Sequence, residues 1–158
     1  MAKEVERKFL VADDSWRQTV AREKTYRQGY ISELNKCSIR IRVAGDAAHL
    51  NIKSATLGIS RQEYEYPLPV ADAEAMLRDF SLGPVIAKTR YFVEHQGHTW
   101  EVDVFEGDNA GLIVAEVELA DEEEAFARPS WLGKEVSDDP RYYNVNLVNH
   151  PYKDWADT

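Results

Sequence analysis

Charged residues of like sign recur at positions i and i+2 in six segments of the chain. The pairs are Glu4/Glu6, Arg40/Arg42, Glu63/Glu65, Lys88/Arg90, Glu101/Asp103 and Glu116/Glu118. Exposed sheet faces usually mix the two signs, because like neighbours repel each other. Arginine guanidinium groups match phosphate oxygens bidentately, and paired carboxylates are hard oxygen ligands for Mg²⁺ or Mn²⁺. The segregated pairs therefore predict a site that binds a phosphate-rich anion together with a divalent metal ion.

The charged pairs lie in segments whose hydrophobic alternation has a period of two, which is typical of β-strands with two different faces. Eight strands are predicted, at about 3–11, 25–31, 36–44, 47–54, 59–68, 85–94, 98–106 and 110–120. Helical spacing predicts a helix over 71–80, and weaker signals predict helices over 13–22, 121–127 and 140–149. This pattern indicates a mainly β (α+β) fold, an eight-stranded antiparallel β-barrel with a few flanking helices, whose interior can hold one small ligand. An ordinary antiparallel sheet with one solvated polar face is the alternative.

Seven basic residues share the charged face of these strands. They are Lys8, Arg40, Arg42, Lys53, Arg61, Lys88 and Arg90. If the barrel closes with this face inward, unpartnered buried charges cost roughly several kcal/mol per ion. A triphosphate carries about four to five negative charges near neutral pH, counting roughly one per phosphate and a terminal ionisation. Together with a divalent metal ion, such an anion would offset the cost of the buried bases.

Length, charge and composition exclude several classes of protein. The 158 residues suit one domain, 1–158, and a formal net charge of −9 argues against a general nucleic-acid binder. No apolar run approaches the ~18 residues of a membrane span, and the N-terminus carries charges where a signal peptide is apolar, so we expect a cytoplasmic protein with no membrane partner. Cys37 is the only cysteine, which excludes an internal disulfide and a cysteine-based zinc cluster. Exposed edges and the C-terminal tail could support a homodimer.

The segment Glu4-Val5-Glu6-Arg7-Lys8 resembles the ExExK signature of the CYTH superfamily, the triphosphate tunnel metalloenzymes, and it stands at the N-terminus as in that family. Further motifs follow in the family's order: Arg40-Ile41-Arg42, Lys53, Ser60-Arg61-Gln62-Glu63-Tyr64-Glu65, Lys88-Thr89-Arg90-Tyr91, Asp103 and Glu116-Val117-Glu118. The resemblance covers about residues 3–147. It is closest to the short bacterial branch, whose members are similar in Gln28-Gly29-Tyr30, in 131–136, in Arg141-Tyr142 and in Asn144.

The resemblance implies a barrel that forms a tunnel and acts on triphosphates. The short bacterial branch is associated with inorganic triphosphatase activity, the hydrolysis of tripolyphosphate to pyrophosphate and phosphate. The acidic group implied for Mg²⁺ or Mn²⁺ is Glu4, Glu6, Glu116 and Glu118, to which Glu63, Glu65 and Asp103 are added. Glu63 and Glu65 would serve a second metal ion or orient the bases. The phosphate-binding group implied is Lys8, Arg40, Arg42, Lys53, Lys88 and Arg90, which Arg61 either joins or supports as a partner of the glutamates.

Phosphoryl transfer requires positioning and charge neutralisation more than covalent chemistry. We expect water to attack the terminal phosphorus in line, activated by a metal ion or by a glutamate of the acidic group such as Glu6. Cationic neighbours are expected to lower the pKa of Lys88, and Tyr30 could then pair with Lys88 as a proton relay. The alternative is that Lys88 only contacts phosphate and that Tyr30 is a packing residue with a satisfied hydroxyl.

Three other functions are compatible with the same residues. An organic triphosphatase, for example one acting on thiamine triphosphate, would need an aromatic clamp, for which Trp131, Tyr142 and Tyr143 are available. A class IV adenylate cyclase would need an adenine site, and no adenine-specific motif is visible. A non-catalytic polyphosphate-binding module would be expected to lose acidic residues while keeping the bases, whereas this chain has both sets.

Overall fold

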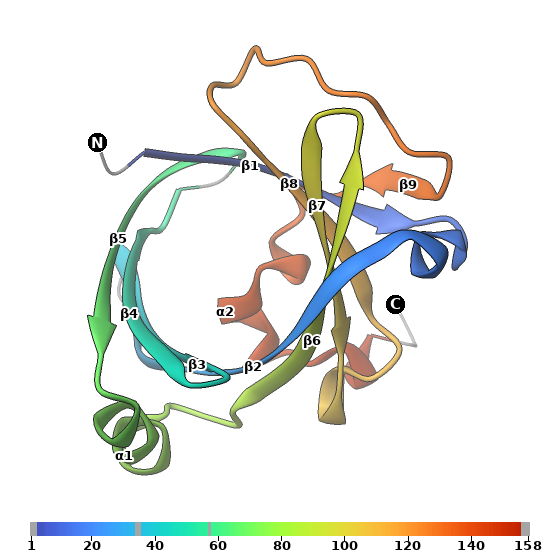
Figure 1. Ribbon diagram of the computed structural model, residues 1–158. Coiled ribbons are helices and arrows are strands. Elements are labelled where there is room, and N and C mark those ends of the chain that lie inside the picture. The colour runs from blue at the N-terminus through green and yellow to red at the C-terminus, as the bar shows by residue number, and fades with distance from the viewer. Residues whose placement is uncertain (1–2, 34–35, 57, 156–158) are drawn as a thin grey trace.

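The computed structural model of the protein, which describes residues 3–33, 36–56 and 58–155, contains a closed antiparallel β-barrel (Figure 1). The strands are β1 (Lys3–Val11), β2 (Val20–Glu33), β3 (Cys37–Ala44), β4 (Ala47–Ser54), β5 (Ser60–Leu68), β6 (Ile86–His95), β7 (His98–Phe105), β8 (Ile113–Leu119) and β9 (Leu132–Glu135). Their order is β5-β4-β3-β2-β6-β7-β8-β1-β9, and the pairing of β1 with β5 closes a ring of eight. The predicted eight-stranded barrel is therefore confirmed. The unpredicted β9 pairs with the end of β1, beyond the residues that meet β5.

The helical elements are short. They are η1 (Ser15–Thr19), α1 (Val70–Phe80), η2 (Gly107–Asn109), η3 (Pro140–Tyr142), α2 (Asn144–Leu147) and η4 (Tyr152–Asp154). The helix predicted over 71–80 is confirmed as α1. The helix predicted over 140–149 is correct only in part, because η3 and α2 are separate short turns. The one predicted over 13–22 is reduced to η1, since the backbone from Val20 onward pairs with β6.

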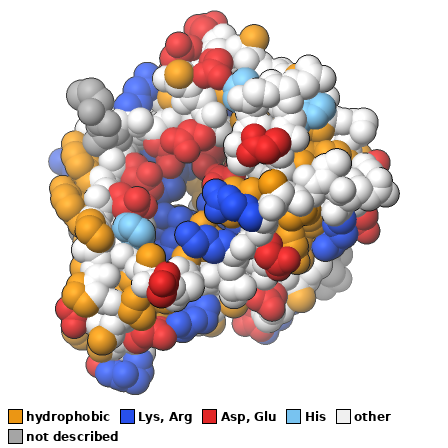
Figure 2. Space-filling view, in the orientation of Figure 1, with side chains coloured by type: hydrophobic (Ala, Val, Ile, Leu, Met, Phe, Trp, Pro, Cys, Tyr) orange, Lys and Arg blue, Asp and Glu red, His pale blue; other side chains and the backbone are white. Residues whose placement is uncertain are grey.

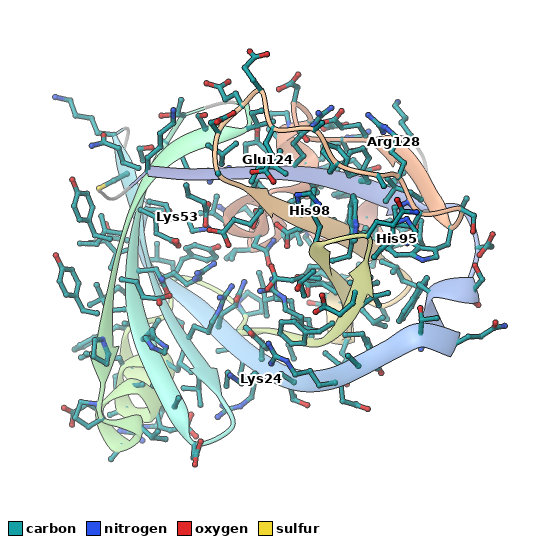
Figure 3. All side chains as sticks on the ribbon, turned by 45° about the horizontal axis from the view of Figure 1, so that its top comes forward. Lys24, Lys53, His95, His98, Glu124 and Arg128 are labelled. Atoms are coloured by element: carbon teal, nitrogen blue, oxygen red, sulfur yellow. The ribbon has the colours of Figure 1, made fainter. Side chains whose placement is uncertain are left out.

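The helix predicted over 121–127 is wrong. Residues 120–131 form a largely irregular segment between β8 and β9. Its Glu124 carboxylate accepts a hydrogen bond from the backbone N–H of Ala120 (2.5 Å) and lies 2.6 Å from Nε2 of His98 (Figure 3). Phe126 packs edge-on against Trp100, with the ring centroids 5.8 Å apart. These tertiary contacts replace the helix start that the consecutive glutamates indicated.

Apolar side chains lie on the outside of the barrel, and flanking segments cover many of them, although Tyr64 and Tyr66 of β5 are exposed. On the β1, β7 and β8 side, Phe9, Trp100 and Trp131 are buried in one cluster together with Trp16 of η1. Burial of each such side chain contributes about 1.5–3 kcal/mol. No helix among the described residues is long and apolar enough to cross a membrane.

Helix α1 covers the outer face of β2 and β3. Its Ala73 and Leu77 are buried against Ile41 of β3. Gly29 in β2 permits this close approach, because a Cβ at that position would lie 2.5 Å from Oγ of Ser81 and 3.0 Å from Cδ2 of Leu77. In Figure 1, α1 lies outside the ring of strands. The helix therefore supports the wall of the barrel and leaves its interior free.

The inward face of four strands changes along its length from polar to apolar. The changes are from Gln28 to Tyr30 in β2, from Lys88 to Ile86 in β6, from Asp103 to Phe105 in β7 and from Glu116 to Val114 in β8. The apolar residues form a buried cluster with Leu147 and Trp155 of the C-terminal segment. Figure 1 shows α2 inside the ring of strands. The C-terminal segment thus fills one part of the interior and leaves the charged part as a cavity.

Candidate active site

Charged side chains line a cavity of about 290 Å³ inside the barrel. Fourteen of its nineteen lining residues are charged, seven acidic and seven basic. The seven basic residues are those predicted from the sequence. Six of the acidic residues were also predicted, and the seventh is Glu101 in place of Asp103. Figure 2 shows acidic and basic side chains gathered around the central hollow of the molecule. The alternative of a solvated polar face is therefore excluded.

The carboxyl groups of Glu6 on β1 and Glu116 on β8 share a hydrogen bond. Burial and the neighbouring Glu116 raise the pKa of Glu6 well above its usual value. Burial also opposes ionisation of Glu116, but Lys8, the hydrogen bond from Glu6 and Arg90 outweigh it and hold the pKa of Glu116 well below its usual value. These opposite directions correspond to a protonated Glu6 that donates a hydrogen bond to an ionised Glu116, and a divalent cation can take the place of the shared proton.

Glu4 on β1 and Glu63 on β5 form a second pair with Lys53 between them. The Lys53 ammonium lies 3.3 Å from Oε1 of Glu4 and 3.4 Å from Oε2 of Glu63. Burial raises the pKa of Glu4, in spite of Lys53. For Glu63 burial is outweighed by Lys53, by the hydrogen bond with Glu4 and by Arg40, so its pKa is lowered. Figure 3 shows Lys53 directed into the barrel.

These carboxyl pairs suit a divalent metal ion that is bound jointly with substrate. No group of three or more His, Cys, Asp or Glu side chains within residues 3–33, 36–56 and 58–155 is arranged as a metal cage. Mg²⁺ commonly takes only one or two carboxylates and completes its shell with waters and substrate phosphates. Each pair supplies that number of carboxylates, and their hard oxygens suit Mg²⁺ or Mn²⁺.

Lys88 and Arg90 on β6 share the carboxylate of Asp103 on β7. Arg90 donates to both oxygens, at 2.7 Å from Nε and 2.9 Å from Nη2, and the Lys88 ammonium lies 2.8 Å from Oδ2. The Lys88 and Asp103 side chains are each only 1% exposed. Burial lowers the pKa of Lys88 to about 7, an effect that Asp103 opposes and that Arg90 and Arg42 reinforce. The two buried cations thus share the Asp103 carboxylate, and Arg90 also lies 3.2 Å from Glu101 and 3.3 Å from Glu116.

Asp103 differs from the role expected for it in the metal-binding group. It does not line the cavity, and both of its oxygens accept from the two cations. Burial would raise its pKa, but Arg90 and Lys88 outweigh burial and lower it. A metal ion could reach this carboxylate only by displacing those bonds, which leaves buried cations unpaired. We therefore assign Asp103 to the positioning of Lys88 and Arg90.

Arg40 and Arg42 project from β3 into the same cavity. Nε of Arg42 donates to Oε1 of Gln28 at 3.0 Å. Burial and the neighbouring Arg40 and Arg90 lower the pKa of Arg42 to about 10, so it remains a cation at neutral pH. Nε of Arg40 is buried and has no hydrogen-bond partner in the described part of the chain.

The proposed relay between Tyr30 and Lys88 is not formed in the described structure. Tyr30 lines the cavity and packs in the inner apolar cluster. The Lys88 ammonium instead donates to Oδ1 of Asn144 (3.1 Å) and pairs with Asp103. No hydrogen bond joins Tyr30 to Lys88 among the described residues. The relay therefore stays a prediction, and the geometry favours a phosphate-binding role for Lys88.

Five polar residues of the site were not predicted as site residues, and one of them is Ser38 of β3, which lines the cavity. Glu101 lines the cavity and accepts from Nη1 of Arg90 at 3.2 Å, and its alternation with Asp103 in one strand was the available signal. Asn51 donates to Oε2 of Glu65 at 2.7 Å, and its position two residues before Lys53 was a similar signal. The other two are Gln28 and Asn144, which are hydrogen-bonded to each other at 2.8 Å.

A closed barrel that encloses a cavity lined by seven basic and seven acidic residues defines a class of protein that encloses a polyanion together with a cation. The CYTH domain family matches residues 2–149, and the chain belongs to this family. Two relatives are named inorganic triphosphatase. The one from Acetivibrio thermocellus is 47% identical over 157 residues, 99% of this chain and 100% of its own length. The one from Nitrosomonas europaea is 38% identical over 149 residues, 92% of this chain and 96% of its own length.

Solved structures show the same architecture. One described as the inorganic triphosphatase NE1496 has a TM-score of 0.67 and 36% identity, and the match covers 92% of this chain and 97% of that chain. The protein PH1012 from Pyrococcus horikoshii OT3 has a TM-score of 0.60 at 17% identity, covering 76% of this chain and 80% of its own. The second likeness shows the fold alone.

Proposed function

We propose that this protein hydrolyses inorganic triphosphate to pyrophosphate and phosphate with the help of Mg²⁺ or Mn²⁺. The observation that carries the proposal is the cavity of about 290 Å³ with seven basic and seven acidic lining residues. This volume is at the lower end of small-molecule sites, which suits a compact polyanion. The relatives named inorganic triphosphatase support the same substrate.

The positions of the aromatic residues argue against an organic triphosphate. Trp131 packs against Trp100 in the apolar cluster on the outside of the barrel, with the ring centroids 5.8 Å apart. Tyr142 packs against Trp155 at 5.0 Å, so only Tyr143 of the three candidate clamp residues lines the cavity. A thiamine or adenine group would need a flat aromatic or apolar surface beside the phosphates. The described cavity lining is too strongly charged to provide one.

In the proposed complex, the seven bases hold the phosphate chain. Arg40 and Lys53 are only loosely paired in the free protein, at 3.9 Å and 3.4 Å from Glu63. A triphosphate can replace Glu63 as the partner of these cations, because it carries more negative charge and accepts charge-assisted hydrogen bonds from both, bidentate ones from Arg40. Lys88 and Arg90 stay anchored to Asp103 and stabilise the charge that develops during transfer.

Glu4, Glu6, Glu116 and Glu118 would hold the metal ion, with Glu63 and Glu65 beside them. When bound, the metal neutralises phosphate charge and lowers the pKa of coordinated water. Glu6 is our candidate for the group whose carboxylate accepts a proton from the attacking water.

Phosphate release by the purified protein tests this function. Tripolyphosphate, pyrophosphate, ATP and thiamine triphosphate are each incubated with Mg²⁺, Mn²⁺ or EDTA. We expect metal-dependent release from tripolyphosphate at a rate far above that from the other three. Preferential release from an organic triphosphate would refute the inorganic substrate. Tight tripolyphosphate binding without turnover would refute catalysis and leave a polyphosphate-binding module.

A further inference from the structure

Residues 142–144 of the C-terminal segment contact basic residues from three different strands. The contacts are Lys8 Nζ to the Tyr142 carbonyl oxygen (3.1 Å), Arg61 Cζ to the Tyr143 ring centroid (5.1 Å) and Lys88 Nζ to Asn144 Oδ1 (3.1 Å). Tyr143 and Asn144 also line the cavity. A segment far from these strands in sequence therefore touches three of the seven bases of the phosphate site.

This segment is anchored independently of the bases. The Tyr143 hydroxyl donates to the carbonyl oxygen of Ser137 (2.8 Å) and accepts from the backbone N–H of Gly58 (3.2 Å). Leu147, one turn further along, is only 1% exposed in the inner apolar cluster. The backbone around Asn144 is thus fixed on both sides, so its side chain can serve as a reference point for the cations around it.

Hydrogen bonds connect Asn144 to a second cation through Gln28. Gln28 is fully buried, accepts from Nε of Arg42 (3.0 Å) and donates through Nε2 to Oδ1 of Asn144 (2.8 Å). Arginine and lysine side chains can only donate. Arg42 at one end and Lys88 at the other therefore fix both amide orientations: the Gln28 oxygen faces Arg42 and the Asn144 oxygen faces Lys88. Neither amide can flip without placing donor against donor.

We propose that Asn144 is a positioning residue for the phosphate-binding cations, directly for Lys88 and through Gln28 for Arg42. The inference rests on the proposed phosphate site and adds residues that act on it. An ammonium group has three donors. Asp103 and Asn144 take up two of them, which leaves one N–H of Lys88 for a phosphate oxygen. Without Asn144 the ammonium has a second free donor, and Asp103 is the one remaining partner of the two that direct it.

The test measures tripolyphosphate binding by calorimetry in EDTA, where metal-dependent turnover is blocked. Asn144→Ala is expected to weaken binding about ten-fold, since a charged hydrogen bond that positions Lys88 is lost. The matched control is Asn146→Ala. Asn146 is in the same short helix, and its side chain donates to the backbone oxygen of Pro140 and to none of the cations. The control should bind tripolyphosphate within two-fold of the wild type.

A double-mutant cycle separates positioning from general loss of structure. In a Lys88→Met background, Asn144→Ala should weaken binding by less than two-fold further, because the side chain that it positions is gone. Gln28→Met should also weaken binding, although Gln28 does not line the cavity, and this effect should shrink in an Arg42→Met background. Thermal unfolding of each variant identifies any that are misfolded. If Gln28→Met is misfolded, the double-mutant cycle of Asn144 and Lys88 alone is sufficient to test the inference.

Two results would overturn the inference: wild-type binding by Asn144→Ala, or a full ten-fold effect of Asn144→Ala in the Lys88→Met background. The outcome is independent of catalysis. If tripolyphosphate binds but is not hydrolysed in the presence of Mg²⁺ or Mn²⁺, the proposed function fails while the positioning role of Asn144 is still decided by the binding cycle.

Discussion

The two sides of the cavity wall hold their charges in different ways. On the β6–β8 side, Lys88 and Arg90 bind Asp103 at 2.7–2.9 Å, and the three side chains are 1–8% exposed. On the β3–β5 side, Lys53 lies 3.4 Å from Glu63, and these two side chains are 17% and 20% exposed. Both sides present cations to the same cavity. The Lys88–Arg90–Asp103 network is buried and closely bonded, whereas the Lys53–Glu63 pair is looser and partly hydrated.

The difference separates two requirements of a polyanion site. Buried cations need a permanent counter-charge, since an unpaired buried ion is strongly destabilising. Asp103 supplies this counter-charge from a buried position beneath Lys88 and Arg90. The two cations are therefore already in place for the substrate and need no reorganisation. Partly hydrated cations need no such partner and can exchange a glutamate for a phosphate at low cost. We expect the β6–β8 side to govern stability and turnover, and the β3–β5 side to adjust affinity.

The largest effect is expected from Asp103→Asn, which removes the counter-charge and keeps the shape. Lys88 and Arg90 then share no buried carboxylate between them, and the free energy of unfolding should fall by about 3–5 kcal/mol. Urea unfolding at pH 8 measures it. The control is Asp108→Asn, an exposed carboxylate paired with Lys153 at 3.3 Å, which should leave the midpoint unchanged. A loss below about 1 kcal/mol in Asp103→Asn would show that the buried network does not carry stability.

The next effect compares one cation from each side in the tripolyphosphate assay. Lys88→Met should lower kcat/KM by about 10³-fold, because it removes a buried donor aimed at the reacting phosphate. Lys53→Met should lower it only about ten-fold to a hundred-fold, the loss of one charged hydrogen bond. Equal losses in the two variants would contradict the division between the sides of the wall.

The strands and their charged face were predictable from the sequence, because a period of two assigns each residue to one face of a strand. That argument placed all seven basic and all seven acidic lining residues on the charged face, although Glu101 was not named as a site residue. The same periodicity does not distinguish an inward side chain that lines the cavity from one that is buried beneath the residues lining it. Asp103 shares the inward face with Glu101, yet its depth follows from bonds to Arg90 and Lys88 on the neighbouring strand.

Other parts of the structure depend on contacts between distant segments and have no local signal. The strand β9 forms because it pairs with β1, more than a hundred residues earlier. The segment over 121–127 has an acidic start typical of a helix, but His98 and Trp100 hold Glu124 and Phe126 in an irregular path. Asn144 reaches Lys88 and Gln28 only because the C-terminal segment enters the barrel.

The pH dependence of tripolyphosphate binding is expected to be a smaller effect than the two above, and it reports on Lys88 of the β6–β8 side alone. Burial lowers the pKa of Lys88 to about 7, so the free protein carries a partly neutral amine above that pH. A bound triphosphate favours the ammonium and raises its pKa, so binding takes up a proton. Between pH 7 and 9 the affinity for tripolyphosphate in EDTA should fall by up to about ten-fold per pH unit. Calorimetry in buffers of different ionisation enthalpy measures the proton uptake directly.

Lys88→Met is the reference for this titration. Its affinity for tripolyphosphate should change less with pH than that of the wild type, and an unchanged pH dependence would assign the proton uptake to another group.

The lowered pKa of Lys88 also affects folding stability. The folded value of about 7 lies below the usual 10.5, so the unfolded chain binds more protons between these pH values. Stability from this group therefore rises with pH across that window, and its destabilising effect is complete below pH 7.

The smallest effect is expected from the exposed glutamate of the β3–β5 side. Glu65 lines the cavity and accepts from Asn51 at 2.7 Å. Its Gln variant keeps an acceptor for that bond, so Glu65→Gln should change the Mg²⁺ concentration for half-maximal activity by less than about three-fold. Glu6→Gln should raise it at least about ten-fold, because the hydrogen-bonded pair with Glu116 loses one anionic oxygen ligand. Equal shifts would place the metal ion between both pairs of glutamates, and a larger shift in Glu65→Gln would move it to the β3–β5 side.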